Sequence, residues 1–463
     1  MLISFNKKLA KNIVSKVYKN VKDISVNSFS NLPLTSKKDV VSKDIYGKYF
    51  NHKLPSVVYQ SSGTTNTPSF WFRDLKEEED VIKFHEEIFK EELEISKRDK
   101  VLVLNCFSLG MWIAGLYTHS AILGLSKLKY NITLASCGIE KDDSYNVLNK
   151  ISGKYDTVVI FGYPGFLTML FSYLLTRKLK TKVKKVCVVT GGDKYDKEWK
   201  KQISLSIKKI FLVKSIYING IYGSAEMGLI GFETTLSKKV KSLYENNANF
   251  KKIIESDIKT VSEPFICEIS SKRFISEIHN NILFLSKDGV IPFLRYKTND
   301  IVSIVDSEVL KKYNIYKKPD KEIIFVFGRS DVMLTYYGIN LYVDMITSII
   351  PSKMNSSIPY KSMVLYKSKI VTGEKLFLKF GINRKIKITD NEKVSFKNSL
   401  ISKLRKISKE YRKLSDTLGP RVEPVIQFLP SDSKLFERLM NQQDPILKNR
   451  IIFSEGKKPK KSI

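Results

Sequence analysis

The sequence predicts an α/β fold in two parts. A large N-terminal domain should hold parallel or mixed sheets covered by helices, and a small C-terminal α+β domain should follow it. Short apolar runs alternate with helical patterns up to residue 260, strand-rich segments come next, and a smaller mixed region begins near residue 328. Alternating strands and helices are typical of a parallel sheet with helices on its faces. A chain of 463 residues is long enough for two or three domains.

Buried parallel strands are predicted where a short apolar run precedes a turn that bears Gly, Pro or Ser. Such runs occupy Val101–Cys106, Thr157–Phe161, Val186–Thr190 and Ser215–Ile218. Apolar residues at helical spacing predict helices over Leu75–Lys97, Leu109–Leu125, Phe166–Lys178 and Lys197–Phe211. Ligands of such sheets bind at the carboxyl ends of the strands, so the turns that follow the strands are the candidate binding loops.

The second half of the chain reads as strands followed by a smaller domain. The predicted strands are Phe265–Ser270, Asn281–Ser286, Asp300–Val305 and Glu322–Phe327. A boundary near Gly328–Asp331 divides the large domain, residues 1–328, from the small C-terminal domain, residues 329–463. In the small domain we expect strands and one long helix, at Ser362–Tyr366, Lys375–Gly381, Val425–Leu429 and Glu392–Arg412.

The two ends of the chain are rich in lysine. At the N-terminus a helix is predicted whose apolar stripe is formed by Leu2, Phe5, Leu9, Ile13, Val17 and Val21. Packing of this helix on the domain surface is favoured over membrane association. The tail Glu455–Ile463 is expected to be disordered. The apolar stretches Gly110–Gly124 and Gly165–Leu175 are too short or too broken to span a bilayer, and no secretory signal is visible, so a cytoplasmic protein is expected.

The net charge of +32 comes from 79 basic and 47 acidic residues. The lysines are spread over the whole chain with no arginine-rich block, which favours solvated faces and argues against nucleic-acid binding. Acidic partners, including nucleotides and acidic carrier proteins, are the alternative. The four cysteines are far apart and the four histidines do not pair at metal-ligand spacing, so buried free thiols are expected.

Two candidate loops are rich in small residues. Ser61–Pro68 concentrates hydroxyls and a glycine in one turn, and successive backbone N–H groups there could donate to phosphate oxygens. Thr190–Asp193 follows an apolar strand and could hold a purine. Each of them alone is also compatible with an ordinary turn.

A third candidate loop, Ile221–Gly228, carries an aromatic ring and a carboxylate. Tyr222 could stack on a base, and Glu226 could bind Mg²⁺ together with phosphates. The structural alternative is a core tyrosine followed by a glutamate at the start of a helix.

The fourth candidate loop, Leu294–Asp300, is followed about thirty residues later by Phe327–Asp331. Asp300 could accept from both hydroxyls of a ribose, and Arg329 could complete that contact. Each could equally form a surface ion pair.

The ordered set of loops resembles the adenylate-forming superfamily, and within it the phenylacetate–CoA ligase branch. The segments that carry the resemblance are "YQSSGTT", "TGGD", "IYGSAEMG", "PFLRYKTND" and, above all, "GRSDVMLTYYGINLY". They cover residues 55–345, with weaker support towards the C-terminus. The resemblance implies that a carboxylate attacks the α-phosphorus of ATP to give acyl-AMP and pyrophosphate. A thiol, of coenzyme A or of a carrier protein's phosphopantetheine arm, then displaces AMP.

The resemblance also implies roles for single residues. The resemblance assigns the phosphate loop to Ser61, Ser62, Gly63, Thr64 and Thr65, and Thr65 would also be catalytic. The adenine would be bound by Gly191, Gly192 and Asp193, with Tyr222 and Gly223 packed against the base. Glu226 would hold Mg²⁺ and act in catalysis, Asp300 and Arg329 would bind the ribose, and Asp331 would be the hinge of the mobile domain.

Two positions depart from the family pattern. Asn66 and Thr67 stand where the phosphate loop usually continues with Gly and Lys, and Thr67 supplies no cation for pyrophosphate. The catalytic lysine of the C-terminal domain has two candidates, Lys434 and Lys448, which the sequence does not separate.

An apolar and aromatic acyl pocket is expected, walled by Phe107, Met111, Trp112, Tyr163, Phe166, Met227 and Ile230, although such residues are as often core. The predicted function is therefore an AMP-forming acid–thiol ligase that acts on a small carboxylic acid. Transfer to a carrier protein or an amine is one alternative, and a degenerate nucleotide-binding homologue without catalysis is another. A homodimer is compatible with the sequence.

Overall fold

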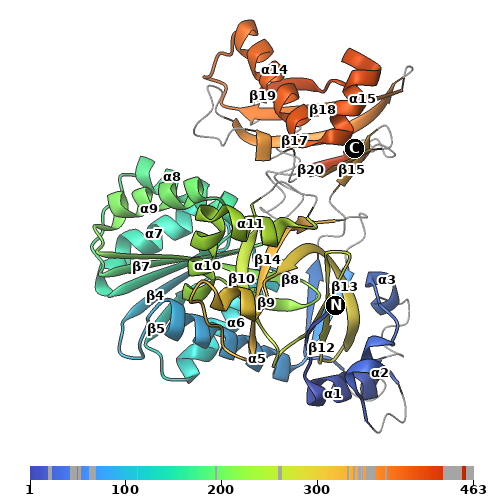
Figure 1. Cartoon of the computed structure of the whole chain (residues 1–463). Coiled ribbons are helices and arrows are strands. Elements are labelled where there is room, and N and C mark those ends of the chain that lie inside the picture. The colour runs from blue at the N-terminus through green and yellow to red at the C-terminus, as the bar shows by residue number, and fades with distance from the viewer. Residues whose placement is uncertain are drawn as a thin grey trace. The chain divides into compact units, whose positions relative to one another are not determined.

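The computed structural model describes residues 1–18, 23–41, 49–50, 54–61, 69–111, 113–192, 195–258, 263–330, 333–336, 339–342, 346, 348–350, 360–370, 373–430 and 451–454. The chain forms two compact units (Figure 1). The first comprises Met1–Ile258 and Pro264–Phe327, and the second comprises Lys259–Glu263 and Gly328–Ile463.

Five parallel strands form one half of a twelve-stranded mixed sheet in the first unit. In sheet order they are β8 (Ser215–Ser224), β7 (Lys185–Gly191), β6 (Thr157–Gly162), β4 (Val101–Cys106) and β5 (Ile132–Ala135). Every residue of β4 and β6 is buried, as the continuous apolar runs predict. The four predicted parallel strands are confirmed. The short edge strand β5 was not predicted, because four residues carry too little periodicity.

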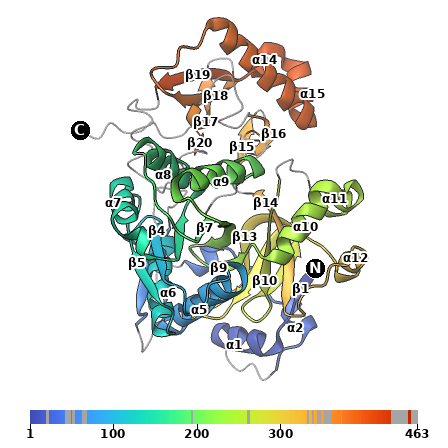
Figure 2. The same ribbon diagram turned by 90° about the vertical axis from the view of Figure 1, so that its left-hand side faces the viewer.

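Helices cover both faces of these strands. Figures 1 and 2 show α5 and α6 on one face and α7, α8 and α9 on the other. Their bounds are α5 (Leu75–Glu87), α6 (Ile113–Lys127), α7 (Lys141–Ile151), α8 (Pro164–Thr176) and α9 (Lys197–Phe211). The predicted helix over Leu75–Lys97 ends earlier, because α5 passes into the π-helical turn η1 (Ile88–Glu92). The short 3₁₀ turn η2 (Ser152–Lys154) follows α7.

Antiparallel strands complete the twelve-stranded sheet, which confirms the predicted mixed α/β fold. In sheet order they are β9 (Gly228–Phe232), β10 (Phe265–Ser270), β14 (Lys321–Arg329), β13 (Phe293–Ile304), β12 (Ile282–Lys287), β11 (Ile275–His279) and β1 (Leu2–Ser4). Helices α10 (Thr235–Asn246) and α11 (Ala248–Glu255) join β9 to β10, and α12 (Ser307–Lys311) joins β13 to β14.

The N-terminal segment packs on this sheet through α1 (Lys7–Val17), α2 (Val26–Ser30) and α3 (Lys37–Val40). Ala10, Ile13 and Val14 are buried, which confirms surface packing of the first helix. The predicted helical stripe was wrong at its start. Leu2 lies in β1, because the Asn6 side chain caps α1 by accepting from the Leu9 amide at 3.1 Å. Val21 lies outside the described residues.

Strands β2 (Val57–Ser61) and β3 (Ser69–Arg73) form an antiparallel hairpin in the first unit. The candidate phosphate loop connects them, and its residues 62–68 lie outside the described part of the chain.

The second unit has a four-stranded sheet in the order β19 (Val425–Pro430), β18 (Gly373–Ile382), β17 (Tyr360–Ile370) and β20 (Ile451–Ser454). A two-stranded ladder, β15 (Met333–Tyr336) and β16 (Ile339–Tyr342), precedes it. The single helix predicted over Glu392–Arg412 was wrong, since α14 (Asp390–Ile407) and α15 (Lys409–Leu418) are separate. Between them Ser408 caps α15 by accepting from the Tyr411 amide at 3.0 Å, and η3 (Gly419–Val422) follows.

No helix in the described ranges combines the length and the apolar character that a bilayer crossing requires. The predicted tail Glu455–Ile463 lies outside the described residues.

Candidate nucleotide site

The segment Ile221–Gly228 is a β-hairpin rather than a loop. Strand β8 continues through Ser224, so Tyr222 and Gly223 lie in the strand, and a tight turn at Ala225–Met227 leads into β9. Pairing with β7 on one side and β9 on the other keeps the end of β8 extended. A Cβ on Gly223 would lie 2.6 Å from the Gly228 carbonyl oxygen, so this close hairpin requires glycine there.

The structure brings Tyr222 and Asp300 together from two different strands. The Tyr222 hydroxyl donates to Asp300 Oδ2 at 2.5 Å, and Asp300 is 6% exposed. The segment Leu294–Asp300, predicted as a loop, lies in β13. The strand is irregular here, because Asn299 has a φ of 66° and the Asp300 amide donates to Thr298 Oγ1 at 3.1 Å. The predicted base-stacking ring and the predicted ribose carboxylate are therefore neighbours.

The turn after β7 lies beside the strand that carries Tyr222. Gly191 pairs with Ile221 across the sheet, and a Cβ on Gly191 would lie 3.3 Å from the Ile221 carbonyl oxygen. The preceding hydroxyl, Thr190 Oγ1, is buried without a hydrogen-bond partner in the structure. Gly192 is exposed with a φ of 78°, and Asp193 lies outside the described residues.

Glu226 lies in the β8–β9 turn with its carboxylate unengaged. The side chain is half-buried and makes no hydrogen bond or ion pair within the described part of the chain. The turn is closed locally by Ser224 Oγ, which accepts from the Met227 amide at 3.2 Å. No cluster of three or more His, Cys, Asp or Glu side chains suited to a metal occurs among the described residues. A single carboxylate fits Mg²⁺ bound largely by phosphates and water.

A buried arginine that was not predicted from the sequence donates hydrogen bonds to the backbone of this turn. Arg73, at the end of β3, is fully buried and donates to the carbonyl oxygens of Ala225, at 3.1 Å, and Glu226. Its Nε donates to the Tyr117 hydroxyl at 3.1 Å and lies 3.4 Å from Glu77 Oε1. The available signal was a lone cation at the end of the apolar run "FWF".

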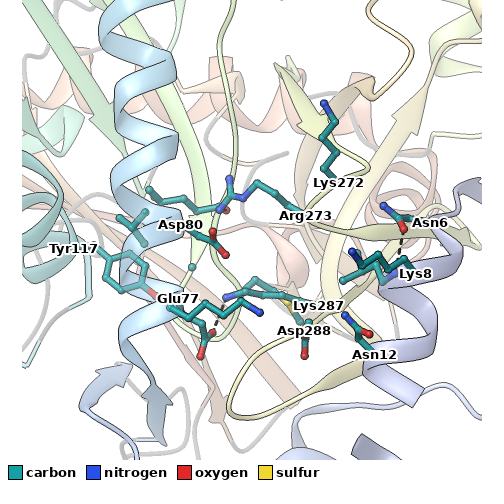
Figure 3. Close-up of a pocket in the computed structure, with 16 residues that line it drawn as sticks. Asn6, Lys8, Asn12, Glu77, Asp80, Tyr117, Lys272, Arg273, Lys287 and Asp288 are labelled. Carbon is teal, nitrogen blue, oxygen red and sulfur yellow. Dashed lines mark hydrogen bonds and ion pairs between the residues drawn. The ribbon is translucent and has the colours of Figure 1, made fainter. Parts of the chain in front are cut away.

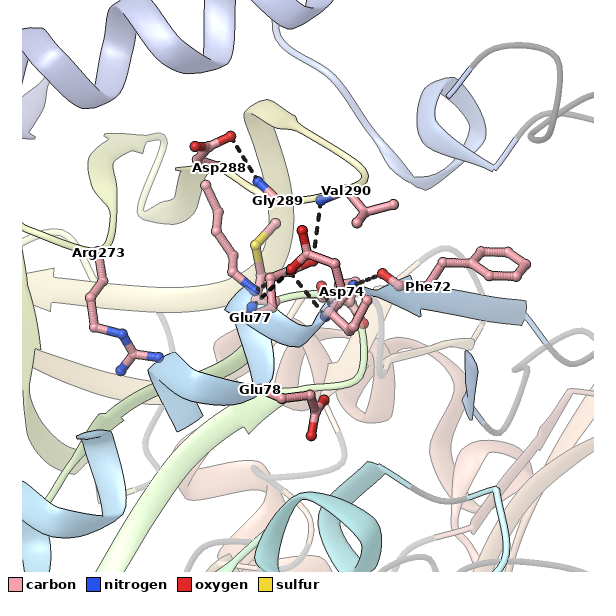
Figure 4. Close-up of polar contacts among 12 residues, drawn as sticks. Phe72, Asp74, Glu77, Glu78, Arg273, Asp288, Gly289 and Val290 are labelled. Carbon is pink, nitrogen blue, oxygen red and sulfur yellow. Dashed lines mark hydrogen bonds and ion pairs between the residues drawn. The ribbon is translucent and has the colours of Figure 1, made fainter. Parts of the chain in front are cut away.

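Glu77 continues this network to a second cation. Its carboxylate accepts from Lys287 Nζ and from the Val290 amide, both at 3.1 Å, and Figure 4 shows the contact with Val290. Burial lowers the pKa of Lys287 to about 8, although the partner Glu77 opposes that change. The Glu77 carboxylate thus lies between two cations, Arg73 and Lys287.

A cavity of about 350 Å³ opens beside this network (Figure 3). It is lined mainly by α1, α5, the start of β9 and the turns that precede β11 and β13; Tyr117, Glu77, Met227, Arg273, Lys287 and Asp288 contribute to its walls. Figure 3 shows α1 on one side of the cavity and Tyr117 on the other. Three members of the network, Glu77, Tyr117 and Lys287, therefore line the cavity, whereas Arg73 is fully buried.

The stability of the wild type should rise relative to Lys287→Met as the pH increases from 8 to 10. Lys287 is protonated in the unfolded chain up to its ordinary pKa of 10.5 but loses its proton near pH 8 in the folded protein. The unfolded state binds more protons in that window, so folding is favoured by up to ~1.4 kcal/mol per pH unit. Urea unfolding at several pH values measures the effect, with Lys16→Met on the neighbouring Asp288 as control. If the free energy of unfolding changes with pH in the same way in the wild type and in Lys287→Met, this prediction is contradicted.

The remaining predicted residues are only partly described. Ser61 ends β2, and Arg329 ends β14 half-buried. The residues outside the described ranges are Ser62, Gly63, Thr64, Thr65, Asn66, Thr67, Trp112, Asp193, Asp331, Lys434 and Lys448. Their roles stay predictions.

The predicted acyl-pocket residues divide into separate groups. Phe107 and Tyr163 are in contact, with ring centroids 4.8 Å apart, and both are buried. Met227 and Ile230 belong to the core cluster that contains Tyr117, whereas Met111 is 41% exposed. Phe166 is buried in α8.

Comparison with solved structures identifies the fold. The sequence matches no protein-family model and no curated protein. The structure resembles 2-hydroxyisobutyryl-CoA ligase in the postadenylation state with R3-HIB-AMP, with a TM-score of 0.57 and 12% identity over 96% of this chain and 84% of the other. The same ligase with 2-HIB-AMP gives a TM-score of 0.53 and 14% identity over 93% and 86%.

The chain therefore has the fold of adenylate-forming enzymes, which is the fold expected from the sequence. At this level of identity the likeness establishes the fold only.

Proposed function

We propose that this protein activates a small carboxylic acid with ATP, releasing pyrophosphate, and transfers the acyl group from AMP to a thiol. The observation that carries the proposal is the Tyr222–Asp300 contact, which lies beside Gly191 and one turn away from the unengaged Glu226 carboxylate. An aromatic ring, a ribose acceptor and a metal carboxylate are the groups that a nucleoside triphosphate requires.

Each residue has a defined part in this proposal. Tyr222 packs against the adenine while its hydroxyl donates to Asp300, and Asp300 and Arg329 bind the ribose. Glu226 would hold Mg²⁺, which when bound neutralises phosphate charge as pyrophosphate leaves. The loop 62–68 would contact the phosphates, and Lys434 or Lys448 would supply a cation. The buried Thr190 hydroxyl, which has no hydrogen-bond partner among the described residues, would be a donor at the adenine side.

The acceptor proposed here is coenzyme A. The two solved structures compared above are of a CoA ligase in complex with R3-HIB-AMP or 2-HIB-AMP, which supports this choice without fixing it. An acidic carrier protein is the second candidate, and the net charge of +32 favours it.

A panel of carboxylic acids tests the proposal through pyrophosphate release, measured with and without coenzyme A in the presence of Mg²⁺. We expect release to depend on at least one acid, and a thioester of the same acid to form when coenzyme A is present. An adenylate without a thioester would favour a carrier protein or an amine as acceptor. Absence of ATP binding by calorimetry would contradict both ligase hypotheses.

A further inference from the structure

Arg73 is a fully buried cation whose Nη2 donates to two carbonyl oxygens of the turn that carries Glu226. Besides Tyr117, Ala225 and Glu226, its Nη1 donates to the Phe72 carbonyl oxygen at 2.8 Å. Burying a guanidinium is costly unless it is paired and hydrogen-bonded, and Glu77 supplies the counter-charge. The protein therefore keeps a buried cation next to this turn, where an apolar side chain could be buried without the desolvation cost of a charge.

The turn has few other attachments. In the described part of the chain, the remaining side-chain hydrogen bond to Ala225–Met227 is the local one from the Met227 amide to Ser224. Besides the apolar packing of the buried Met227, the hydrogen bonds of Arg73 thus attach the turn to the end of the β2–β3 hairpin. Because it binds the carbonyl of Glu226 itself, it fixes the backbone from which that carboxylate projects.

We propose that Arg73 is a positioning residue that holds the Ala225–Met227 turn so that the Glu226 carboxylate meets a cation bound to a polyphosphate. The proposal rests on the proposed function and deepens it. Residues that orient metal ligands without touching the metal typically change metal affinity by about 10- to 100-fold when replaced. A lysine at this position keeps the charge, but one ammonium cannot reproduce the planar fork that spans Tyr117, Phe72 and two turn carbonyls.

A second buried arginine in the same unit provides a matched control. Arg295 is 4% exposed, is paired with Glu277 at 2.7 Å, and donates to the carbonyl oxygens of Ser30 and Leu32. Like Arg73, it combines a buried carboxylate with backbone carbonyls, two here and three at Arg73, but its contacts hold the N-terminal segment.

The experiment compares Arg73→Lys with Arg295→Lys in the full chain. Both variants are expected to lower the melting temperature. Only Arg73→Lys should raise the Mg²⁺ concentration for half-maximal ATP–pyrophosphate exchange by about 10-fold or more. The same contrast is expected without turnover, as a weakened Mg²⁺-dependent thermal stabilisation by ATP. Tyr117→Phe, which removes one acceptor of Arg73, should keep the fold and shift the Mg²⁺ requirement in the same direction by less.

The outcomes distinguish failure of the positioning role of Arg73 from failure of the proposed function. Equal Mg²⁺ requirements in Arg73→Lys and Arg295→Lys would overturn the positioning role and leave Arg73 as a purely structural residue. If Arg73→Lys does not fold, an unchanged Mg²⁺ requirement in Tyr117→Phe would overturn it. A wild-type protein that neither exchanges pyrophosphate nor is stabilised by ATP with Mg²⁺ would refute the proposed function, and the positioning role with it.

Discussion

Replacing Asp300 by Ala is expected to reduce Mg²⁺-dependent ATP–pyrophosphate exchange at least ~100-fold, and Glu226→Ala should do the same. Asp300 accepts from Tyr222 and is the proposed ribose acceptor, so its loss removes a ligand contact and leaves the Tyr222 hydroxyl without its partner. Glu226 carries the unengaged carboxylate at the neighbouring turn, and without it Mg²⁺ would lose its protein ligand.

Tyr222→Phe is the matched control for Asp300→Ala. It keeps the ring that would pack against adenine and removes the hydroxyl bound to Asp300, so exchange should fall much less than in Asp300→Ala. Exchange undiminished in both Asp300→Ala and Glu226→Ala would show that the nucleotide binds elsewhere. Circular dichroism on each variant would show whether a loss reflects unfolding.

Arg295→Met should lower the free energy of unfolding by about 3–5 kcal/mol, the cost of removing one partner of a buried ion pair. The substitution removes the cation paired with the Glu277 carboxylate, which is 2% exposed and keeps only its 3.3 Å contact with His279 Nε2 among the described side chains. It also leaves the carbonyls of Ser30 and Leu32 without this donor. Urea denaturation followed by tryptophan fluorescence measures the change.

The exposed ion pair of Lys7 with Asp23 is the control for Arg295→Met. Lys7→Met should cost less than about 1 kcal/mol, because both side chains of that pair are mostly solvated. If Arg295→Met lowers the free energy of unfolding no more than Lys7→Met does, the stabilising role of the buried Arg295 contacts is contradicted.

The sequence predicted the parallel half of the sheet well because its signal is local. Strands β4 and β6 are continuous apolar runs buried on both faces, and α9 has the bounds expected from its periodicity. Strand β11 was missed because Ile275–His279 alternates over only five residues. The break between α14 and α15 depends on a single capping serine inside an otherwise helical pattern.

The sequence singled out two candidate-site residues that the structure places in contact, but not the residues that support them. Tyr222 and Asp300 stood out by residue type and order, and they are in contact although 78 positions apart in the chain. Tyr222 lies in a strand where a loop was predicted, and Asp300 lies inside β13 rather than at the start of a strand, because pairing across the sheet extends β8 and β13 beyond their apolar cores. Arg73 could not be assigned a role from the sequence, since its partners come from β3, α5, α6 and the β8–β9 turn.

The attachment of the N-terminal segment has a consequence for biosynthesis. Leu2 pairs with Glu277, Thr35 exchanges backbone hydrogen bonds with Arg295 and Lys297, and the Arg295 side chain binds the carbonyl of Ser30. The segment of residues 2–35 therefore has no docking surface until more than 250 further residues have been made. During translation α1 cannot pack its apolar stripe on the sheet before those residues are made, so completion of this unit is a late step of folding.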